Sequence, residues 1–370
     1  MLIGVPKEIK NHEYRVGLTP ESVAELVQDG QSVIIETGAG AGVGASDEAY
    51  IAAGAEIVST AAEIFERAEM VIKVKEPQAV ERAMLREGQI LYTYLHLAPD
   101  PEQTKDLIKS KAVCIAYETV TDDNGGLPLL TPMSQVAGRL AIQVGAKALQ
   151  KDGGGRGVLL GGVPGVAPAK VVIIGGGDVG FNAAQMAVGM QADVTILERN
   201  NERMEELSNY FGVKAKIVRS TPTILRDLVT SADMVVGAVL IPGAAAPKLV
   251  TRDMLSDMLD GSVLVDVAID QGGCFETSKA TTHADPTYII DGVVHYCVAN
   301  MPGAVSRTST YALNAATLSH AKKIARDGWK AALKADPHLL NGLNVCEGKL
   351  TYAAVGEALG LESVDPASCL

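Results

Sequence analysis

The sequence is poor in several features that mark other classes of protein. Aromatic residues make up only 4% of its 370 residues, and no uninterrupted apolar run reaches the length that spans a bilayer. Acidic residues outnumber basic ones, giving a net charge of −12, and no basic stretch stands out. A nucleic-acid partner is therefore not expected, and neither is a membrane partner.

Metal-site and disulfide signatures are missing as well. The six histidines are scattered, and none forms an H-x-x-x-H pair, so we expect no metal. The five cysteines are an odd number without a C-x-x-C pair, which is typical of reduced thiols rather than a disulfide framework. The N-terminal segment lacks the layout of a signal peptide, and we expect a cytoplasmic protein.

The first third of the chain alternates short apolar runs with helical patterns, which predicts a parallel sheet covered on both faces. Thr19 and Pro20 form a good helix start, with threonine as the cap and proline in the first turn. The predicted strands are 2–5, 33–36, 70–74, 90–95 and 112–116, and the predicted helices are 20–28, 47–53, 61–66 and 102–110.

Two long helices, predicted over 133–150 and from 310 to about 335, bracket a second run of strands. Those strands are predicted at 171–174, 192–197, 214–218, 234–238 and 262–267, with a turn-linked pair, 288–291 and 293–297, around Gly292. We therefore predict an α/β protein with two Rossmann-like domains joined by long helices. A nucleotide-binding domain, 131–307, is inserted into a discontinuous substrate domain, 1–130 and 308–370.

The most informative motif is G-x-G-x-x-G at Gly175, Gly177 and Gly180, directly after the predicted strand 171–174. The first glycine permits a tight turn, the second lets the backbone approach a pyrophosphate, and the third lets a helix pack close to the strand. The helix N-terminus would offer free N–H groups to the phosphates. The alternative is an ordinary glycine-rich loop, but the strand–turn–helix context favours dinucleotide binding.

Glu198 ends the next predicted strand, 18 residues after Gly180. A carboxylate at this position accepts hydrogen bonds from a ribose diol and repels a 2′-phosphate, which favours NAD over NADP. The nearby Arg199 and Arg203 would weaken that preference for NAD over NADP. The alternative for Glu198 is a solvated loop charge.

Three polar residues follow predicted strands of the first third, where open parallel sheets place their sites. Lys75 would bind a substrate carboxylate or act as a base, with Lys73 as its rival on the same strand face. His96 is a candidate proton carrier near neutral pH, and its alternative is a structural histidine. Arg15 would bind a carboxylate at two points, although a lone loop arginine is usually solvated.

Two further candidates belong to the predicted nucleotide-binding domain. Asp270 follows the strand 262–267 and could orient water, bind the substrate amine or face the ribose, whereas Asp266, inside the strand, is interpreted as structural. Asn300 and Met301 could hold the nicotinamide carboxamide. The alternative for Asp270 and Asn300 is an ordinary polar loop residue.

Together these stretches resemble the alanine dehydrogenase family, whose sister group is the NAD-binding subunit of proton-translocating transhydrogenase. The resemblance spans residue 3 to past 300 and is carried by I-G-V-P-K-E-I-K-N-H-E-Y-R-V, V-I-K-V-K-E-P, Y-L-H-L-A, L-P-L-L-T-P-M-S-Q-V-A-G-R, G-G-V-P-G-V-A-P-A, D-V-A-I-D-Q-G-G and V-A-N-M-P-G-A-V. The chain departs from the family pattern at Asp178, Glu198, Arg203 and Lys279, among other positions.

The resemblance implies reversible oxidative deamination of L-alanine to pyruvate and ammonia with NAD, in a homo-oligomer that is expected to be a hexamer. It implies that Arg15 and Lys75 hold the substrate carboxylate and that His96 and Asp270 transfer protons. It also implies a set of NAD-contacting residues, namely Ser134, Gly175, Gly177, Asp178, Val179, Gly180, Glu198, Arg203, Ser220, Val239, Leu240, Val267, Ala268, Ile269, Asp270, Val298, Ala299, Asn300 and Met301.

Two alternative functions stay open at this stage. One is a related enzyme, either a lysine- or saccharopine-type dehydrogenase or a free-standing transhydrogenase subunit. The other is an NAD-binding sensor or regulatory protein that has lost catalysis, against which the presence of Arg15, Lys75, His96 and Asp270 argues.

Overall fold

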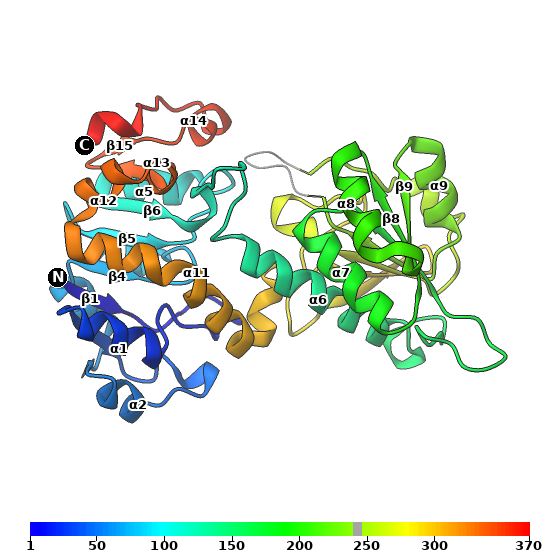
Figure 1. Cartoon of the computed structure of the whole chain (residues 1–370), viewed down its shortest axis with the longest axis horizontal. Helices are drawn as coiled ribbons and strands as arrows, with labels where there is room; N and C mark the ends of the chain where they lie inside the picture. Colours follow the sequence, from blue (N-terminus) through cyan, green and yellow to red (C-terminus); the bar gives the residue numbers. More distant parts are fainter. Residues whose placement is uncertain (240–245) are drawn as a thin grey trace. The chain divides into compact units, whose positions relative to one another are not determined.

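The computed structural model describes residues 1–239 and 246–370, which divide into two compact units. Unit 1 comprises Met1–Met133 and Gly303–Leu370, and unit 2 comprises Ser134–Pro302. Long helices lie near both crossings, α6 (Thr131–Ala148) at the first and α11 (Ser306–Asp327) at the second (Figure 1). The predicted α/β class, with one unit inserted into the chain of the other, is confirmed.

Unit 1 is built on a sheet of eight strands in the order β15-β14-β6-β5-β4-β1-β2-β3. The strands are β1 (Leu2–Val5), β2 (Ser32–Glu36), β3 (Glu56–Val58), β4 (Met70–Ile72), β5 (Ile90–Thr93), β6 (Val113–Ala116), β14 (Leu343–Cys346) and β15 (Lys349–Leu350). Strands β1 to β6 are all parallel, and their spatial order, 3-2-1-4-5-6, is that of a Rossmann sheet. The returning chain adds β14 antiparallel to β6 at one edge.

Helices cover both faces of this sheet because neighbouring strand residues point to opposite sides. Leu91 packs with Phe65 and Leu107 in one buried cluster, whereas the Tyr92 hydroxyl donates a hydrogen bond to the Thr317 carbonyl of α11. Figure 1 shows α1 and α11 along the near face. The other helices of unit 1 are α1 (Pro20–Gln28), α2 (Asp47–Ala52), α3 (Ala61–Arg67), α4 (Ala79–Arg82), α5 (Pro101–Ser110), α12 (Trp329–Ala335), α13 (Pro337–Leu340) and α14 (Ala353–Leu359).

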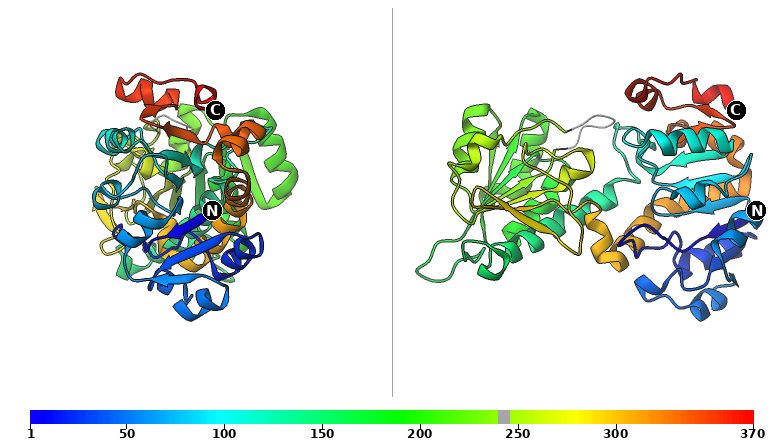
Figure 2. Two further views of the ribbon diagram at one scale, coloured as in Figure 1. Left: turned by 90° about the vertical axis from the view of Figure 1, so that its left-hand side faces the viewer. Right: turned by 180° about the vertical axis from the view of Figure 1, so that it is seen from behind.

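Unit 2 has a second sheet, β12-β13-β11-β10-β7-β8-β9, whose first five strands in chain order repeat the 3-2-1-4-5 order of unit 1, with β13 next to β11 and β12 at the edge. Its strands are β7 (Lys170–Ile174), β8 (Asp193–Glu198), β9 (Ala215–Arg219), β10 (Met234–Gly237), β11 (Val263–Asp266), β12 (Thr287–Ile290) and β13 (Val293–Tyr296), and its shorter helices are α7 (Asp178–Gly189), α8 (Asn201–Phe211), α9 (Pro222–Thr230) and α10 (Arg252–Leu255). Only β12 is antiparallel among these strands, as the turn predicted at Gly292 requires. Within unit 2, the loop before β7 extends away from the sheet (Figure 2).

Two sequence-based expectations about the elements are wrong in detail. The helix predicted from 310 to about 335 is interrupted at Gly328, whose φ of 78° and ψ of 151° separate α11 from α12. The predicted strands that precede Lys75, His96 and Asp270 also end early, β4 at Ile72, β5 at Thr93 and β11 at Asp266. As a result, Lys75 and His96 lie three residues beyond their strands and Asp270 lies four residues beyond, farther from the strand ends than predicted.

Candidate functional site

Lys73 and Lys75, the two rival lysines, have different surroundings in unit 1. The Lys73 side chain is fully buried, and its Nζ lies 2.8 Å from a carboxylate oxygen of both Glu8 and Glu81. Burial acts to lower the pKa of Lys73, but the two carboxylates outweigh it and raise that pKa. Lys75 is 7% exposed, and its Nζ lies 3.7 Å from Glu76 Oε2. Lys73 is therefore locked in a buried ion cluster, and Lys75 is the better candidate for binding a substrate.

Arg15 is buried rather than solvated, contrary to the usual state of a loop arginine. It follows β1 in the loop before α1, is 2% exposed, and forms a two-point ion pair with Glu13, with Nε–Oε1 at 2.7 Å and Nη2–Oε2 at 2.5 Å. Burial acts to lower the pKa of Arg15, but Glu13 outweighs it and raises that pKa. The guanidinium is thus a fixed buried cation, oriented before any ligand arrives.

His96 adopts a left-handed backbone conformation, with φ of 50°, just beyond the end of β5. Few residues other than glycine adopt this conformation, so its neighbours must hold it in place. Its backbone N–H donates to Glu118 Oε1 at 2.6 Å, and its ring stacks on Tyr94 with a centroid distance of 5.7 Å. The side chain is 38% exposed, and its Nδ1 lies 3.8 Å from Glu118 Oε1.

Electrostatic contacts tie these residues of unit 1 into one neighbourhood. The positive charge of Arg15 acts to lower the pKa of the Tyr94 hydroxyl, and the Tyr94 ring also stacks on His96. Burial acts to raise the pKa of Glu76, but the nearby charges of Lys75, Lys10 and His96 lower it overall. Tyr94 is therefore a neighbour of both Arg15 and His96, and Glu76 is a neighbour of both Lys75 and His96.

The glycine turn of unit 2 has the local geometry that the motif predicts. Gly175 has φ of 100°, and a Cβ there would lie 2.7 Å from the Ala238 carbonyl oxygen. A Cβ on Gly180 would lie 1.8 Å from the Gly175 carbonyl oxygen, so α7 packs directly against the turn. At Gly177, by contrast, a Cβ would meet nothing within 4 Å. This open space before the N-terminus of α7 fits a pyrophosphate.

Glu198, at the end of β8, is connected to the glycine turn by hydrogen bonds. Its Oε2 accepts from the Gly176 N–H at 2.8 Å, and its Oε1 accepts from the N–H groups of Arg199 and Asn200 at 2.6 and 3.0 Å. Burial acts to raise the pKa of Glu198, but these backbone donors lower it overall. Arg203 Nε donates to the Gly176 carbonyl at 2.7 Å. Glu198 is therefore an ionised acceptor beside the turn rather than a solvated loop charge.

Asp270 and Asn300 are brought together in unit 2. Asp270 is exposed in the short 3-10 helix Val267–Gln271, and its Oδ1 accepts from the Asn300 N–H at 3.4 Å. Asn300 has φ of 63°, and its carbonyl oxygen lies 3.1 Å from His283 Nε2. Asp266 is buried and accepts from the Cys274 N–H at 2.9 Å, in agreement with its structural interpretation.

The other predicted cofactor residues of unit 2 lie on several elements. Ser134 is on α6, Asp178 and Val179 begin α7, Ser220 follows β9, Val239 follows β10, Val267, Ala268 and Ile269 precede Asp270, and Val298, Ala299 and Met301 flank Asn300. The predicted contact at Leu240 lies outside the described residues. Within residues 1–239 and 246–370, no three or more His, Cys, Asp or Glu side chains are grouped as a metal site, and no helix is long and apolar enough to cross a membrane.

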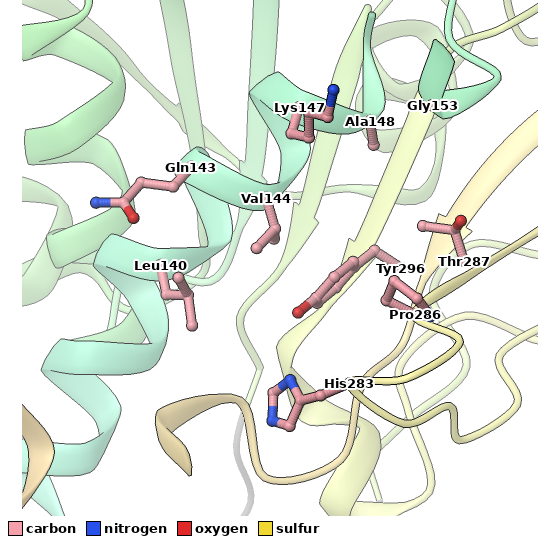
Figure 3. Close-up of a pocket in the computed structure, with 10 residues that line it drawn as sticks. All are labelled: Leu140, Gln143, Val144, Lys147, Ala148, Gly153, His283, Pro286, Thr287 and Tyr296. Atoms are coloured by element: carbon pink, nitrogen blue, oxygen red, sulfur yellow. The ribbon is translucent and has the colours of Figure 1, made fainter. Parts of the chain in front are cut away.

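A pocket of about 430 Å³ in unit 2 is distinct from these residues. Leu140 and Val144 of α6 form one wall, and His283 and Tyr296 face them from the other (Figure 3). None of the predicted site residues lines it. The contact between His283 and the Asn300 backbone connects the pocket to them.

Sequence reasoning missed the carboxylates that hold the site residues of unit 1. Each of three glutamates accepts a hydrogen bond from the backbone N–H of a site residue: Glu8 from Lys75 at 3.3 Å, Glu13 from Arg15 at 3.0 Å and Glu118 from His96 at 2.6 Å. Glu8 and Glu13 lie inside a quoted motif, but a glutamate in a loop gives no sign of burial. Only the tertiary contacts identify their role.

The family comparisons cover nearly the whole chain. The N-terminal domain model of the alanine dehydrogenase/PNT family matches residues 4–137, and the C-terminal domain model matches residues 141–353. An alanine dehydrogenase of Halomonas elongata is 60% identical over 370 residues, which is 100% of both chains. One of Methanococcus maripaludis is 58% identical over 359 residues, covering 97% of this chain and 96% of its own.

Solved structures agree with these matches. An L-alanine dehydrogenase has a TM-score of 0.93 at 52% identity, covering 97% of this chain and 99% of its own. A transhydrogenase from Sinorhizobium meliloti has a TM-score of 0.83 at 23% identity, covering 95% of this chain and 100% of its own, which indicates a shared fold alone.

Proposed function

Because this chain belongs to the alanine dehydrogenase/PNT family, we propose that it is an NAD-dependent alanine dehydrogenase. The reaction is the reversible oxidative deamination of L-alanine to pyruvate and ammonia. The observation that carries the proposal is the cluster of Arg15, Lys75 and His96 in unit 1, two buried cations beside an accessible imidazole. Such a cluster suits a small amino acid whose carboxylate is bound while its α-carbon reacts.

In this proposal Arg15 and Lys75 bind the substrate carboxylate. Glu13 and Glu76 already balance their charges and limit their motion, so little reorganisation is needed when the substrate binds. Orientation of this kind contributes up to about 7–11 kcal/mol of barrier reduction in ideal cases. The carboxylate contacts therefore fix the α-carbon for reaction.

His96 and Asp270 are proposed to move protons around the carbinolamine and imine forms of the substrate. A positioned imidazole typically contributes roughly 10²–10⁴-fold to such a reaction. NAD, when bound, supplies the acceptor for the hydride that leaves the α-carbon. The chain's own groups bind the amino acid, accept the amine proton and assist the attack of water on the imine.

For the cofactor we propose NAD rather than NADP. The family implies a dinucleotide, and the ionised Glu198 beside the glycine turn supports NAD because its carboxylate would repel a 2′-phosphate. Residues 131–307 are proposed as the NAD-binding domain, and residues 1–130 and 308–370 as the substrate domain. The NAD contacts predicted above, including those at Asp178 and Asn300, belong to this proposal.

The experiment that tests the activity supplies the purified protein with NAD and L-alanine at alkaline pH, where the substrate amine is neutral, and follows NADH formation. L-Lysine and saccharopine form the comparison panel, and NADP replaces NAD in a parallel series. We expect NADH from L-alanine and NAD. NADH from lysine or saccharopine alone would reassign the substrate, and NADH binding without turnover of any of them would favour the regulatory alternative.

We also propose a cytoplasmic homo-oligomer, with a hexamer as the expected state. The loop before β7 supports self-association because it exposes three large apolar side chains, Leu159, Val163 and Val166, which are 66%, 54% and 63% exposed. Val163 and Val166 also form an antiparallel bridge that shapes the loop. Light scattering after size exclusion tests the assembly, and Val163→Asp should yield smaller particles if this loop lies in an interface.

A further inference from the structure

The three residues that follow β4 have left the regular sheet, yet the contacts below account for every one of their backbone polar groups. The Lys73 N–H donates to the Tyr92 carbonyl at 3.2 Å, and the Lys73 carbonyl accepts from the Tyr117 hydroxyl at 3.0 Å. The Val74 carbonyl accepts from the Tyr94 N–H at 3.3 Å. At the far end, the Lys75 carbonyl accepts from Thr93 Oγ1 at 3.0 Å.

The two remaining N–H groups are both taken by a single carboxylate oxygen. Glu8 Oε1 accepts from Val74 N at 2.6 Å and from Lys75 N at 3.3 Å. A side chain from the loop after β1 thus replaces the ladder partner that the segment loses where β4 ends. This arrangement fixes the backbone from which the Lys75 side chain projects.

The second oxygen of Glu8 anchors the carboxylate itself. Glu8 Oε2 accepts from Lys73 Nζ at 2.8 Å, and the same ammonium lies 2.8 Å from Glu81 Oε1. The side chains of all three residues are at most 2% exposed. Burial acts to raise the pKa of Glu8, and that pKa remains above its ordinary value despite Lys73. Holding two carboxylates around one ammonium without water is costly, so a stability role alone is a weak reason for the cluster.

We propose that Glu8 is a positioning residue for Lys75, and that the buried Lys73 holds Glu8 in place for this task. This inference rests on the proposed role of Lys75 in binding the substrate carboxylate. It concerns a residue that touches the backbone of Lys75 and no reacting atom. Misplacement of a binding group by about 1 Å costs up to roughly 10²-fold in rate, which is the scale on which Glu8 acts.

Glu81 offers a matched control because it shares Lys73 with Glu8 but does not touch Lys75. Its Oε2 instead accepts from the Gln78 N–H at 2.7 Å, at the start of α4. Glu8→Ala and Glu81→Ala therefore remove one buried partner of the same ammonium. Only the first also releases two N–H groups of the segment 73–75.

The test measures kcat and KM for pyruvate, with ammonia and NADH, in both variants. We expect Glu8→Ala to lower kcat/KM for pyruvate by about 10–100-fold, mainly through KM, and Glu81→Ala to change it by less than about threefold. Glu8→Gln keeps an acceptor oxygen and should recover most of the loss. On a Lys75→Ala background, Glu8→Ala should have little further effect, because both changes remove the same function.

Hydrogen–deuterium exchange supplies a readout that does not depend on turnover. Amides of the peptide containing Val74 and Lys75 should exchange faster in Glu8→Ala than in Glu81→Ala, with melting temperatures as the check on folding. Equal kinetics and equal exchange in the two variants would overturn the role of Glu8, as would a full additional loss on the Lys75→Ala background. Failure of the proposed function would give a different result. Either the wild-type protein would not turn over pyruvate, or the Lys75→Ala variant would keep wild-type rates and so show that Lys75 does not act on pyruvate.

Discussion

Replacing Gly180 by alanine tests the packing on which the glycine turn depends. The added Cβ would lie 1.8 Å from the Gly175 carbonyl oxygen, whereas ordinary van der Waals contact begins at 3.4 Å, so this separation must grow by 1.6 Å. Ile173 Cγ2 would also lie only 3.2 Å from the same Cβ, closer than ordinary contact. The start of α7 must therefore move away from the end of β7.

The expected cost follows from the size of that movement. Overpacking a well-packed interior costs about 1–3 kcal/mol, and a backbone oxygen cannot rotate away as a side chain can, so we expect the upper end of this range. About 3 kcal/mol corresponds to a fall in melting temperature of roughly 6–12 °C for a domain of this size. Because the N–H groups of α7 move with the helix, the dissociation constant for NADH should rise by at least about tenfold.

Two glycines of the same helix region give matched controls. A Cβ at Gly177 or at Gly189 would meet nothing within 4 Å. Gly177→Ala should leave the melting temperature unchanged but weaken NADH binding, because its Cβ occupies the approach of the pyrophosphate. Gly189→Ala should leave binding unchanged and stabilise the end of α7 by up to about 1 kcal/mol.

The assay is titration of each variant with NADH by fluorescence, alongside thermal unfolding followed by circular dichroism. Wild-type affinity together with a wild-type melting temperature in Gly180→Ala would refute the packing argument. Unchanged affinity in Gly177→Ala would instead refute the placement of the pyrophosphate, while leaving the packing argument intact.

Three further predictions concern single charges. Arg15→Met and Lys75→Met should each lower kcat/KM for pyruvate by at least about 10-fold, because each removes a charged hydrogen-bond donor worth about 1.5–3 kcal/mol. The dissociation constant for NADH, measured by fluorescence, should stay within about a factor of two. Wild-type kinetics in both variants would contradict the proposed carboxylate contacts. Glu198→Ala should weaken NADH binding and narrow its advantage over NADPH, and an unchanged ratio of the two dissociation constants would contradict the role of Glu198. Burial lowers the pKa of His295 below its ordinary 6.5, so the unfolded chain binds more protons between the two values and stability falls as the pH drops below about 6.5. The loss of melting temperature between pH 7.5 and 5.5 should therefore be smaller in His295→Gln, and an equal loss would exclude this histidine as a cause.

Much of the fold follows from patterns that are local in the sequence. The helix 20–28 is predicted to the residue because Thr19 caps it, its Oγ1 accepting from the Ser22 N–H at 3.2 Å, and Pro20 opens it. The glycine turn is predicted because its motif is short and directly follows a strand; the constraint at Gly180, for example, comes from the Gly175 carbonyl oxygen only five residues earlier. Gly328 shows the limit, since periodicity continues across it while its positive φ ends the helix.

The candidate site is less accessible to sequence reasoning because tertiary contacts decide it. Lys73 and Lys75 look equivalent along the chain, and only the buried carboxylates of Glu8 and Glu81 distinguish them. Arg15 looks like a solvated loop residue until Glu13 is seen beside it. Long-range pairing between charged residues has no signature in spacing, so these roles emerge only from the folded chain.

The late arrival of β14 has a consequence for synthesis on the ribosome. Strand β6 ends at Ala116, and its outer partner β14 begins at Leu343, 227 residues later (343 − 116). At a synthesis rate of about 5–20 residues per second, the edge of β6 stays unpaired for roughly 11–45 s before β14 is synthesised. An unpaired edge invites pairing with other nascent chains, so translation speed and chaperone supply should affect the yield of native protein more than its final stability does.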